Sequence, residues 1–223
     1  MKSNSKRLGR GELDQIEAAI ERAESRTSAE LVVVLASQSG RYDRAEDLFG
    51  ILLAVAVTGA VWVFGQDLRP DWGGEFELAI GLAPLLLVFG VTFIVGVWIA
   101  TRNPFLARPF IPAAQMRDEM QRSASEAFMT RRIRATAHSN GLLIYISLFE
   151  RLVWIVGDDA IAHAFEPATW DAARDRIIKG FKDGSPADAI AEAIDQVAES
   201  LALKFPRSAD DANEIPNTVH LAN

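Results

Sequence analysis

Two long apolar runs without a charged side chain, residues 48–66 and 78–101, constrain this chain more than any other feature of its sequence. A helix rises about 1.5 Å per residue, so about 20 residues cross the roughly 30 Å hydrocarbon core of a bilayer. Both runs reach that length, and Pro84 falls within the first two turns of the second, where a helix tolerates it. The alternative is a helical hairpin buried in a soluble protein, but neither run has a polar stripe that would face water. We therefore predict two membrane spans.

The basic residues that flank the two runs predict their orientation. The three arginines nearest the first run on its N-terminal side and the three nearest the second run on its C-terminal side contrast with the connecting loop 67–77, which has four acidic residues and one arginine. The protein is expected in the cell (inner) membrane. By the positive-inside rule, both termini lie in the cytoplasm and the short acidic loop lies on the outer side of that membrane. Tryptophans near the run ends are typical of a membrane interface. The flanking arginines are Arg26, Arg41, Arg44, Arg102, Arg108 and Arg117, and the tryptophans are Trp62, Trp72 and Trp98.

The remainder of the chain reads as one α/β domain. Apolar spacing predicts helices at 12–26 and 115–138, and the β-branched run at 29–37 predicts a central strand. Residues 142–148 and 151–156, separated by Phe149 and Glu150, predict a β-hairpin. A short helix at 157–165 and a helix at 167–181 are expected to follow, with a break between Lys179 and Gly184. The last helix is expected to open with Ser185 as N-cap and Pro186 as its first residue.

Neither soluble half can close a core alone, because a single strand has two unpaired edges and little to bury against. The membrane hairpin is therefore predicted to be an insertion in one domain, and its two spans return the chain to the side that it left. The expected divisions are residues 1–44 and 113–205 for the two parts of the soluble domain, 45–112 for the hairpin, and 206–223 for an irregular tail folded back on the domain. Gly141 is expected to end the 115–138 helix in a left-handed conformation.

Composition excludes several classes of function. The formal net charge of −7 argues against a nucleic-acid partner, which requires clustered basic residues. The chain has no cysteine, which excludes disulfides, thiolate nucleophiles and cysteine-based metal sites. Basic residues near the N-terminus are not followed by an apolar segment, so a cleaved signal peptide is not expected.

Several blocks, taken in order, resemble the TPM domain family. They are Glu30 before "LVVVLA", the segment "TAHSNGLLIYISLFERLVWIVGDDAIAHAF", Trp170, and the closing "LKFPRSADDANEIPN". Ile215 stands where the family usually has leucine, and Ala160 stands where many members have glycine. The resemblance implies a small mixed sheet flanked by helices, usually membrane-tethered or exported. It also implies a role in maintaining membrane protein complexes. Some members are described as acid phosphatases, and calcium binding at an acidic loop has been associated with the fold.

Four carboxylates are candidate ligands for a hard cation. Asp158 and Asp159 follow a strand, Glu30 begins another strand, and Glu150 lies in the hairpin turn. Ca²⁺ and Mg²⁺ take oxygen ligands of this kind from loops. The alternative is that Asp158 caps the short helix after it, while Asp159 interacts favourably with the positive end of that helix. The sequence contains no EF-hand loop.

A phosphatase would use a carboxylate or a metal-activated water together with a cation for the phosphoryl oxygens. Asp158 or Asp159 would supply the first and Arg151 the second, although no Gly-rich phosphate loop is present. Three scattered histidines are interpreted as structural, and two tryptophans, Trp154 and Trp170, as core aromatics. The histidines are His138, His163 and His220.

Three functional hypotheses follow. The favoured one is a membrane-anchored auxiliary module that presents a TPM-like domain to a membrane protein complex. The second is a metal-assisted phosphatase. The third is self-association through the hairpin, because small residues allow close helix contacts in lipid. The residues that would allow it are Gly50, Gly59, Gly81, Gly90 and Gly96.

Overall fold

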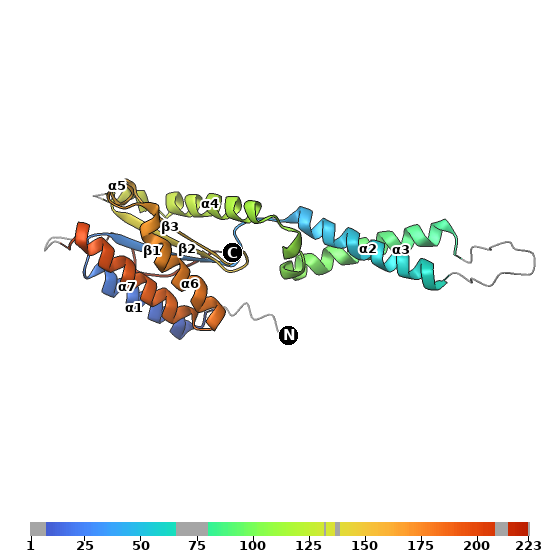
Figure 1. Ribbon diagram of the computed structural model, residues 1–223, viewed down its shortest axis with the longest axis horizontal. Coiled ribbons are helices and arrows are strands. Elements are labelled where there is room, and N and C mark those ends of the chain that lie inside the picture. The colour runs from blue at the N-terminus through green and yellow to red at the C-terminus, as the bar shows by residue number, and fades with distance from the viewer. Residues whose placement is uncertain (1–7, 66–79, 132, 137–138, 208–213, 223) are drawn as a thin grey trace, which may run out of the picture. The chain divides into compact units, whose positions relative to one another are not determined.

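The computed structural model describes residues 8–65, 80–131, 133–136, 139–207 and 214–222. The chain forms two compact units. One unit is Arg41–Gln115, and the other combines Met1–Gly40 with Met116–Asn223. Figure 1 shows the elements of both units. The first unit is helical, and the second contains the sheet.

The helical unit is a hairpin of α2 (Asp43–Gly65) and α3 (Leu82–Arg102), two helices long and apolar enough to cross a membrane. Two 3₁₀ turns follow, η1 (Pro104–Leu106) and η2 (Arg108–Phe110). The predicted spans at 48–66 and 78–101 correspond to these helices, although α3 begins at Leu82, after Gly81 in extended conformation. Pro84 lies in the first turn of α3, where its missing N–H breaks no helix hydrogen bond. Trp72 lies outside the described residues.

Small residues bring α2 and α3 together. The buried residues of α2 are Ala45, Gly50 and Ala54, and those of α3 are Gly96 and Ala100. A Cβ placed on Gly96 would lie 2.9 Å from the Cα of Gly50, so the helices are in backbone contact there. Many of the larger apolar side chains of both helices remain exposed. This distribution is typical of helices that pack in lipid, where close approach replaces the burial of large side chains.

The second unit is built on a four-stranded mixed sheet of order β3-β2-β1-β4. Its strands are β1 (Glu30–Ala36), β2 (Gly141–Ser147), β3 (Leu152–Gly157) and β4 (His220–Ala222). β1 is parallel to β2 and β4, and β2 is antiparallel to β3. The predicted hairpin of β2 and β3 and the mixed sheet are both confirmed. The expectation of a wholly irregular tail was wrong, because residues 220–222 pair with β1.

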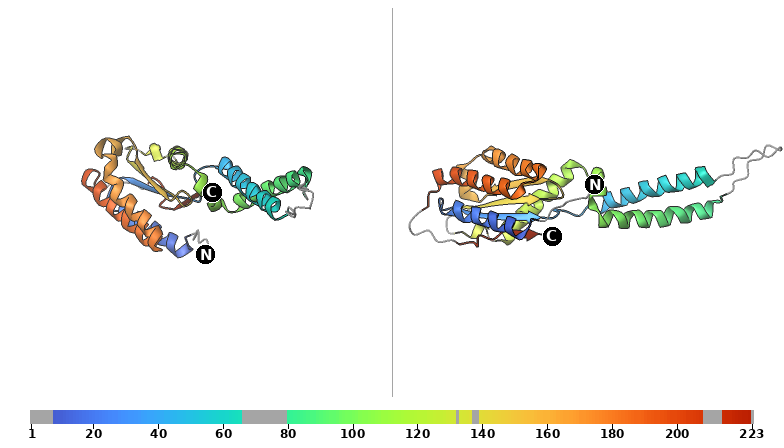
Figure 2. Two further views of the ribbon diagram at one scale, coloured as in Figure 1. Left: turned by 45° about the vertical axis from the view of Figure 1, so that its right-hand side comes forward. Right: turned by 90° about the horizontal axis from the view of Figure 1, so that it is seen from below.

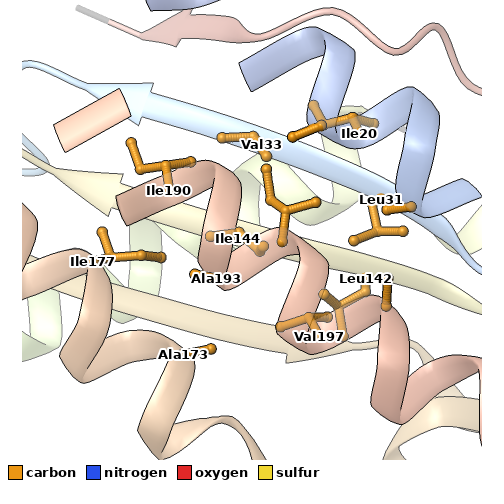
Figure 3. Close-up of a cluster of buried hydrophobic side chains, with 14 of the residues drawn as sticks. Ile20, Leu31, Val33, Leu142, Ile144, Ala173, Ile177, Ile190, Ala193 and Val197 are labelled. Carbon is orange, nitrogen blue, oxygen red and sulfur yellow. The ribbon is translucent and has the colours of Figure 1, made fainter. Parts of the chain in front are cut away.

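Helices cover both faces of the sheet (Figures 1 and 2). α1 (Arg10–Glu24), α6 (Asp171–Asp183) and α7 (Pro186–Lys204) lie on one face, and α4 (Ala113–Thr130) lies on the other. Alternate residues of β1 and β2 point to each face, so both central strands are buried along their whole length. On the first face, Ile20 of α1, Ile177 of α6 and Ile190 of α7 meet Val33 and Ile144 (Figure 3).

The connection between β1 and its parallel neighbour β2 contains the whole hairpin of α2 and α3, followed by α4. Parallel strands need a crossover over one face of the sheet, and α4 provides it. Met120, Ala124 and Phe128 of α4 are buried against the sheet. The hairpin is therefore an insertion in a β-α-β unit.

The structure corrects the boundaries of several predicted helices. α4 ends at Thr130 rather than at residue 138, and a 3₁₀ turn, η3 (Ile133–Ala135), follows so that Ile133 reaches the core. The left-handed residue is Ser139, with φ 51°, and not Gly141. Gly141 instead begins β2, where a Cβ would overlap Ile133. α6 continues through the predicted break to Asp183 and ends at Gly184, whose φ is 84°.

The remaining elements are α5 (Asp159–Ala164) and η4 (Pro167–Trp170). Ser185 and Pro186 open α7 as predicted, although the Ser185 side chain makes no capping hydrogen bond. Trp170 is buried in the core, as expected. Trp154 is not a core residue, because β3 is an edge strand and leaves this side chain 37 % exposed.

Candidate functional site

The strand directions divide the predicted site residues between two ends of the sheet. Glu30 pairs with Gly141 at the start of β1 and β2, and Gly157 ends β3 beside them. Glu30 and Asp158 therefore lie at this end, which we call the Glu30 end. Glu150 and Arg151 lie in the turn between β2 and β3, at the Glu150 end. A strand of six residues spans about 20 Å, so the structure does not bring the four predicted carboxylates together.

Glu30 holds the C-terminal tail. Its side chain is buried, and its two carboxylate oxygens accept hydrogen bonds from the backbone N–H groups of Glu214, at 3.0 Å, and Ile215, at 3.3 Å. These two residues belong to the NEIPN segment. A buried carboxylate is stabilised by such donors, and without it both N–H groups would lose their acceptor. Glu30 therefore acts in this structure as an anchor for the tail.

Asp158 is only 3 % exposed and interacts with Arg134. The Arg134 Nε lies 3.5 Å from Asp158 Oδ1, and a terminal nitrogen of the same guanidinium donates to Asp159 Oδ2 at 2.9 Å. Asp158 occupies the N-cap position of α5, but its side chain makes no capping hydrogen bond. Its Oδ2 is buried without a hydrogen-bond partner. Thus an ion pair with Arg134, and not a capping hydrogen bond, accounts for the side-chain contact of Asp158. Asp159 lies in the first turn of α5, as the alternative interpretation expected, and also pairs with Arg134.

Glu150 is hydrogen-bonded to the chain segment that leads into the hairpin of α2 and α3. It is 2 % exposed, and its Oε1 accepts a hydrogen bond from the N–H of Ser39 at 2.9 Å. Its Oε2 accepts from the hydroxyl of Ser147 at the end of β2. Arg151, the predicted phosphate ligand, follows in a left-handed conformation with φ 56° and is exposed. It lies at the opposite end of β3 from Asp158.

One buried acid was not singled out in the sequence. Glu24, the last residue of α1, is 8 % exposed, and its Oε1 accepts a hydrogen bond from the N–H of Leu31 at 3.0 Å. Burial raises the pKa of Glu24 to about 7, with a smaller contribution from the negative charge of Glu30, while the Leu31 N–H acts in the opposite direction. A signal was present, because Ile16, Ile20 and Glu24 recur every four residues on one helix face.

Glu24 and Glu30 line a cavity of about 180 Å³ at the Glu30 end. Other polar side chains of its wall come from α1 and from the tail, among them Glu21, Arg207 and Asn217. Across the described part of the chain, no three His, Asp or Glu side chains are placed to hold a metal ion together.

The histidines fall in separate places. His220 of β4 lies with its Nδ1 2.9 Å from a terminal nitrogen of Arg131, and burial, followed by the charge of Arg131, lowers its pKa. His163 Nδ1 lies 2.6 Å from the carbonyl oxygen of Asp159 in its own short helix. His138 lies outside the described residues.

These observations define a small α/β domain with a mixed sheet, interrupted by an apolar helical hairpin. Residues 110–200 match the model of the TPM domain family. The chain therefore contains a TPM domain, and the matched residues run from the end of the hairpin unit through most of α7.

Comparison with solved structures shows a similar fold in the BA42 protein of the psychrophilic bacterium Bizionia argentinensis, determined by NMR. The TM-score is 0.58 and the sequence identity 20 %, with 100 % of each chain covered. At this identity the likeness is one of fold. No curated protein matches the chain in sequence.

Proposed function

We propose that this is an integral membrane protein whose hairpin anchors the TPM domain at the cytoplasmic surface of the inner membrane, as an auxiliary module for a membrane protein complex. The observation that carries the proposal is the exposure of apolar side chains along α2 and α3. Val55, Phe64 and Ile94 are each more than half exposed. A water-soluble protein rarely leaves so large a continuous apolar surface uncovered, whereas a bilayer covers it.

The points where the chain leaves and re-enters the sheet-containing unit support this proposal. A Cβ on Gly40 would lie 2.6 Å from Cγ of Glu119 in α4, so these two segments are in contact. Ser123 of α4 also donates its hydroxyl hydrogen to the carbonyl oxygen of Ser39 at 2.6 Å. Both ends of the insertion therefore start from one place on the domain, as a two-span hairpin requires.

The end of α3 has the residues expected of a membrane interface. The Arg102 guanidinium lies 5.1 Å from the centroid of the Trp98 ring, and Arg102 is exposed. Tryptophan and arginine are favoured at the level of the lipid head groups, where an amphipathic ring and a cation are both solvated. Together with the flanking arginines, this supports a cytoplasmic location for this end of the hairpin.

Cysteine accessibility tests the topology, because the chain has no native cysteine. We expect single cysteines near either terminus to react with an impermeant maleimide only after cells are permeabilised. A cysteine at residue 74 should react in intact cells. The protein should also remain in the pellet after alkaline carbonate extraction. Termini on opposite sides of the membrane, or release by carbonate, would refute the anchored arrangement.

The outer edge of β3 is the surface that we assign to the partner. No described strand pairs with that edge, and Trp154 is exposed beside it. An exposed edge strand can add a strand from another protein, and tryptophan is frequent among residues that dominate binding energy. We expect Trp154→Ala to reduce recovery of a partner from native membranes in mild detergent. Leu203→Ala is the matched control, because Leu203 is an 85 % exposed apolar side chain on α7.

Two measurements on the purified protein, partner recovery and phosphate-ester turnover, distinguish the auxiliary role from phosphatase activity. Recovery of the protein without any partner from native membranes would contradict the auxiliary role. Turnover of a phosphate ester that is lost in a folded Asp158→Asn variant would instead favour the metal-assisted phosphatase.

A further inference from the structure

The cavity at the Glu30 end has more acidic than basic side chains on its walls. Three glutamates contribute to it, Glu21, Glu24 and Glu30, whereas Arg207 is its only cationic side chain in the described residues. Arg207 already donates to the backbone carbonyl oxygen of Glu24 at 3.0 Å. Both oxygens of Glu30 accept from backbone N–H groups of the tail. The cavity therefore retains excess negative charge.

Glu24 supplies a second and independent observation. Its side chain is 8 % exposed, Oε1 accepts from the Leu31 N–H, and Oε2 is buried without a hydrogen-bond partner within bonding distance and angle. The Asn217 side chain lies near enough to the carboxyl group to lower its pKa, but this effect is smaller than that of burial. A buried carboxylate oxygen without a donor is costly, because it has lost water and gained nothing in return. The cavity volume of about 180 Å³ leaves room for a donor beside this oxygen.

We infer that the cavity binds a small cation that carries N–H donors, an ammonium or guanidinium group, through Glu24 with Glu21 at the rim. A group of this kind donates to Glu24 Oε2 and offsets the negative charge of the wall. A metal ion fits the site less well, because no three of these carboxylates converge on one point. The cation can belong to a free amine or to a lysine or arginine side chain of a partner, and these two sources share the same chemistry. This inference does not depend on the proposed membrane function.

The electrostatics of the site make binding depend on pH. The groups that face Glu24 are Glu21 of α1, Glu30 of β1 and Arg207 of the tail. A pKa of about 7 means that a proton occupies Glu24 in much of the protein at neutral pH. A cation competes with that proton, so its affinity should be about tenfold higher at pH 8 than at pH 6.

The test uses the full-length ¹⁵N-labelled protein in detergent micelles and follows the amide signal of Leu31, which donates to Glu24. We expect methylguanidinium and methylammonium to shift this signal in a saturable manner. Tetramethylammonium, which has the same charge but no N–H, should leave it unchanged. Equal shifts with all three cations, or an affinity that does not rise with pH, would overturn the inference.

Substitutions in the cavity and titrations with metal ions test whether Glu24 is the group that binds the cation. Glu24→Gln should abolish the response, and Glu21→Gln, which leaves the buried group intact, should weaken binding severalfold. Glu199→Gln, at an exposed position of α7, is the control. A response retained by a folded Glu24→Gln variant, or produced by Mg²⁺ or Ca²⁺ at lower concentrations than the amines, would refute the assignment. A lysine peptide that saturates the site at a tenth of the methylammonium concentration identifies a protein side chain as the ligand, and equal affinity identifies a free amine.

Discussion

Oε1 of Glu150 accepts a hydrogen bond from the backbone N–H of Ser39 at 2.9 Å, which joins the turn after β2 to the segment that leaves β1. Because the second oxygen of Glu150 accepts from Ser147, one buried carboxylate holds the ends of both parallel strands together. The helical hairpin unit begins directly after Gly40, at Arg41. This contact therefore fixes the point at which the insertion begins.

Glu150→Ala should lower the free energy of unfolding by about 2–4 kcal/mol, because the buried Ser147 hydroxyl and the partly buried Ser39 N–H lose their acceptor. Thermal unfolding of the protein in detergent, followed by circular dichroism, measures the change. Glu166→Ala is the control, since Glu166 is exposed. Equal effects of the two substitutions would show that the buried contacts of Glu150 contribute little.

Glu30→Gln should loosen the C-terminal tail without unfolding the sheet. A neutral amide is a weaker acceptor than a carboxylate for the N–H groups of Glu214 and Ile215. Hydrogen exchange at Ile215 should accelerate by about tenfold, while that of Ile144 in the central strand β2 should not change. Faster exchange throughout β2 would mean instead that Glu30 supports the whole core.

The pH dependence of stability should show a contribution from Glu24. Its pKa is raised from 4.5 to about 7 by burial, so the folded protein retains a proton that the unfolded chain has released. This contribution is fully present below about pH 4.5 and is lost as the pH rises through about 7. Glu24→Gln should therefore flatten the decrease in melting temperature between pH 5 and pH 8. A decrease identical to that of the unmodified protein would rule out Glu24 as its source.

The two glycines at the contact between α2 and α3 should tolerate substitution poorly. A Cβ on Gly50 would lie 2.7 Å from Cγ2 of Val97 and 3.1 Å from the carbonyl oxygen of Phe93. Gly50→Leu should separate the two helices. The separation can be measured as reduced disulfide formation between cysteines that replace Glu46 and Thr101, because the Thr101 hydroxyl donates to Oε2 of Glu46 at 2.8 Å. Gly59→Leu should leave the cross-link intact, because a Cβ there meets nothing within 4 Å. Equal loss of the cross-link in both variants would argue against this packing.

Periodicity predicted the parts of the fold that are long and regular. The apolar runs became α2 and α3, and the stripe of Ile190, Ile194 and Val197 became the buried face of α7. β4 was not predicted, because a strand of three residues is too short to show a pattern and depends on the contacts of the tail with Glu30 and β1. The end of α4 was misplaced since Ile133 is drawn into the core by tertiary packing rather than by a local stop signal.

The residues of the site were harder to predict than the fold. Glu150 and Asp158 precede and follow β3, so the length of that strand already separates them. The separation of Glu150 and Asp158 could be predicted from the sequence once residues 142–156 were identified as a β-hairpin. The pairing of Arg134 with Asp158 depends on the turn after α4, which no periodicity specifies. The burial of Glu24 was not predicted, because a charged residue is normally assigned to the exposed face of a helix. Its position nevertheless belongs to the apolar face of α1.

The neighbouring strands β1 and β2 are more than a hundred positions apart in the chain, with the apolar helices α2 and α3 between them. During synthesis both edges of β1 stay unpaired until the hairpin has been made and β2, and later β4, have followed it. Pairings over so long a separation form slowly. Completion of the sheet therefore comes only after α2 and α3 have been synthesised, so the domain cannot finish folding before the segment that we propose as its membrane anchor is available.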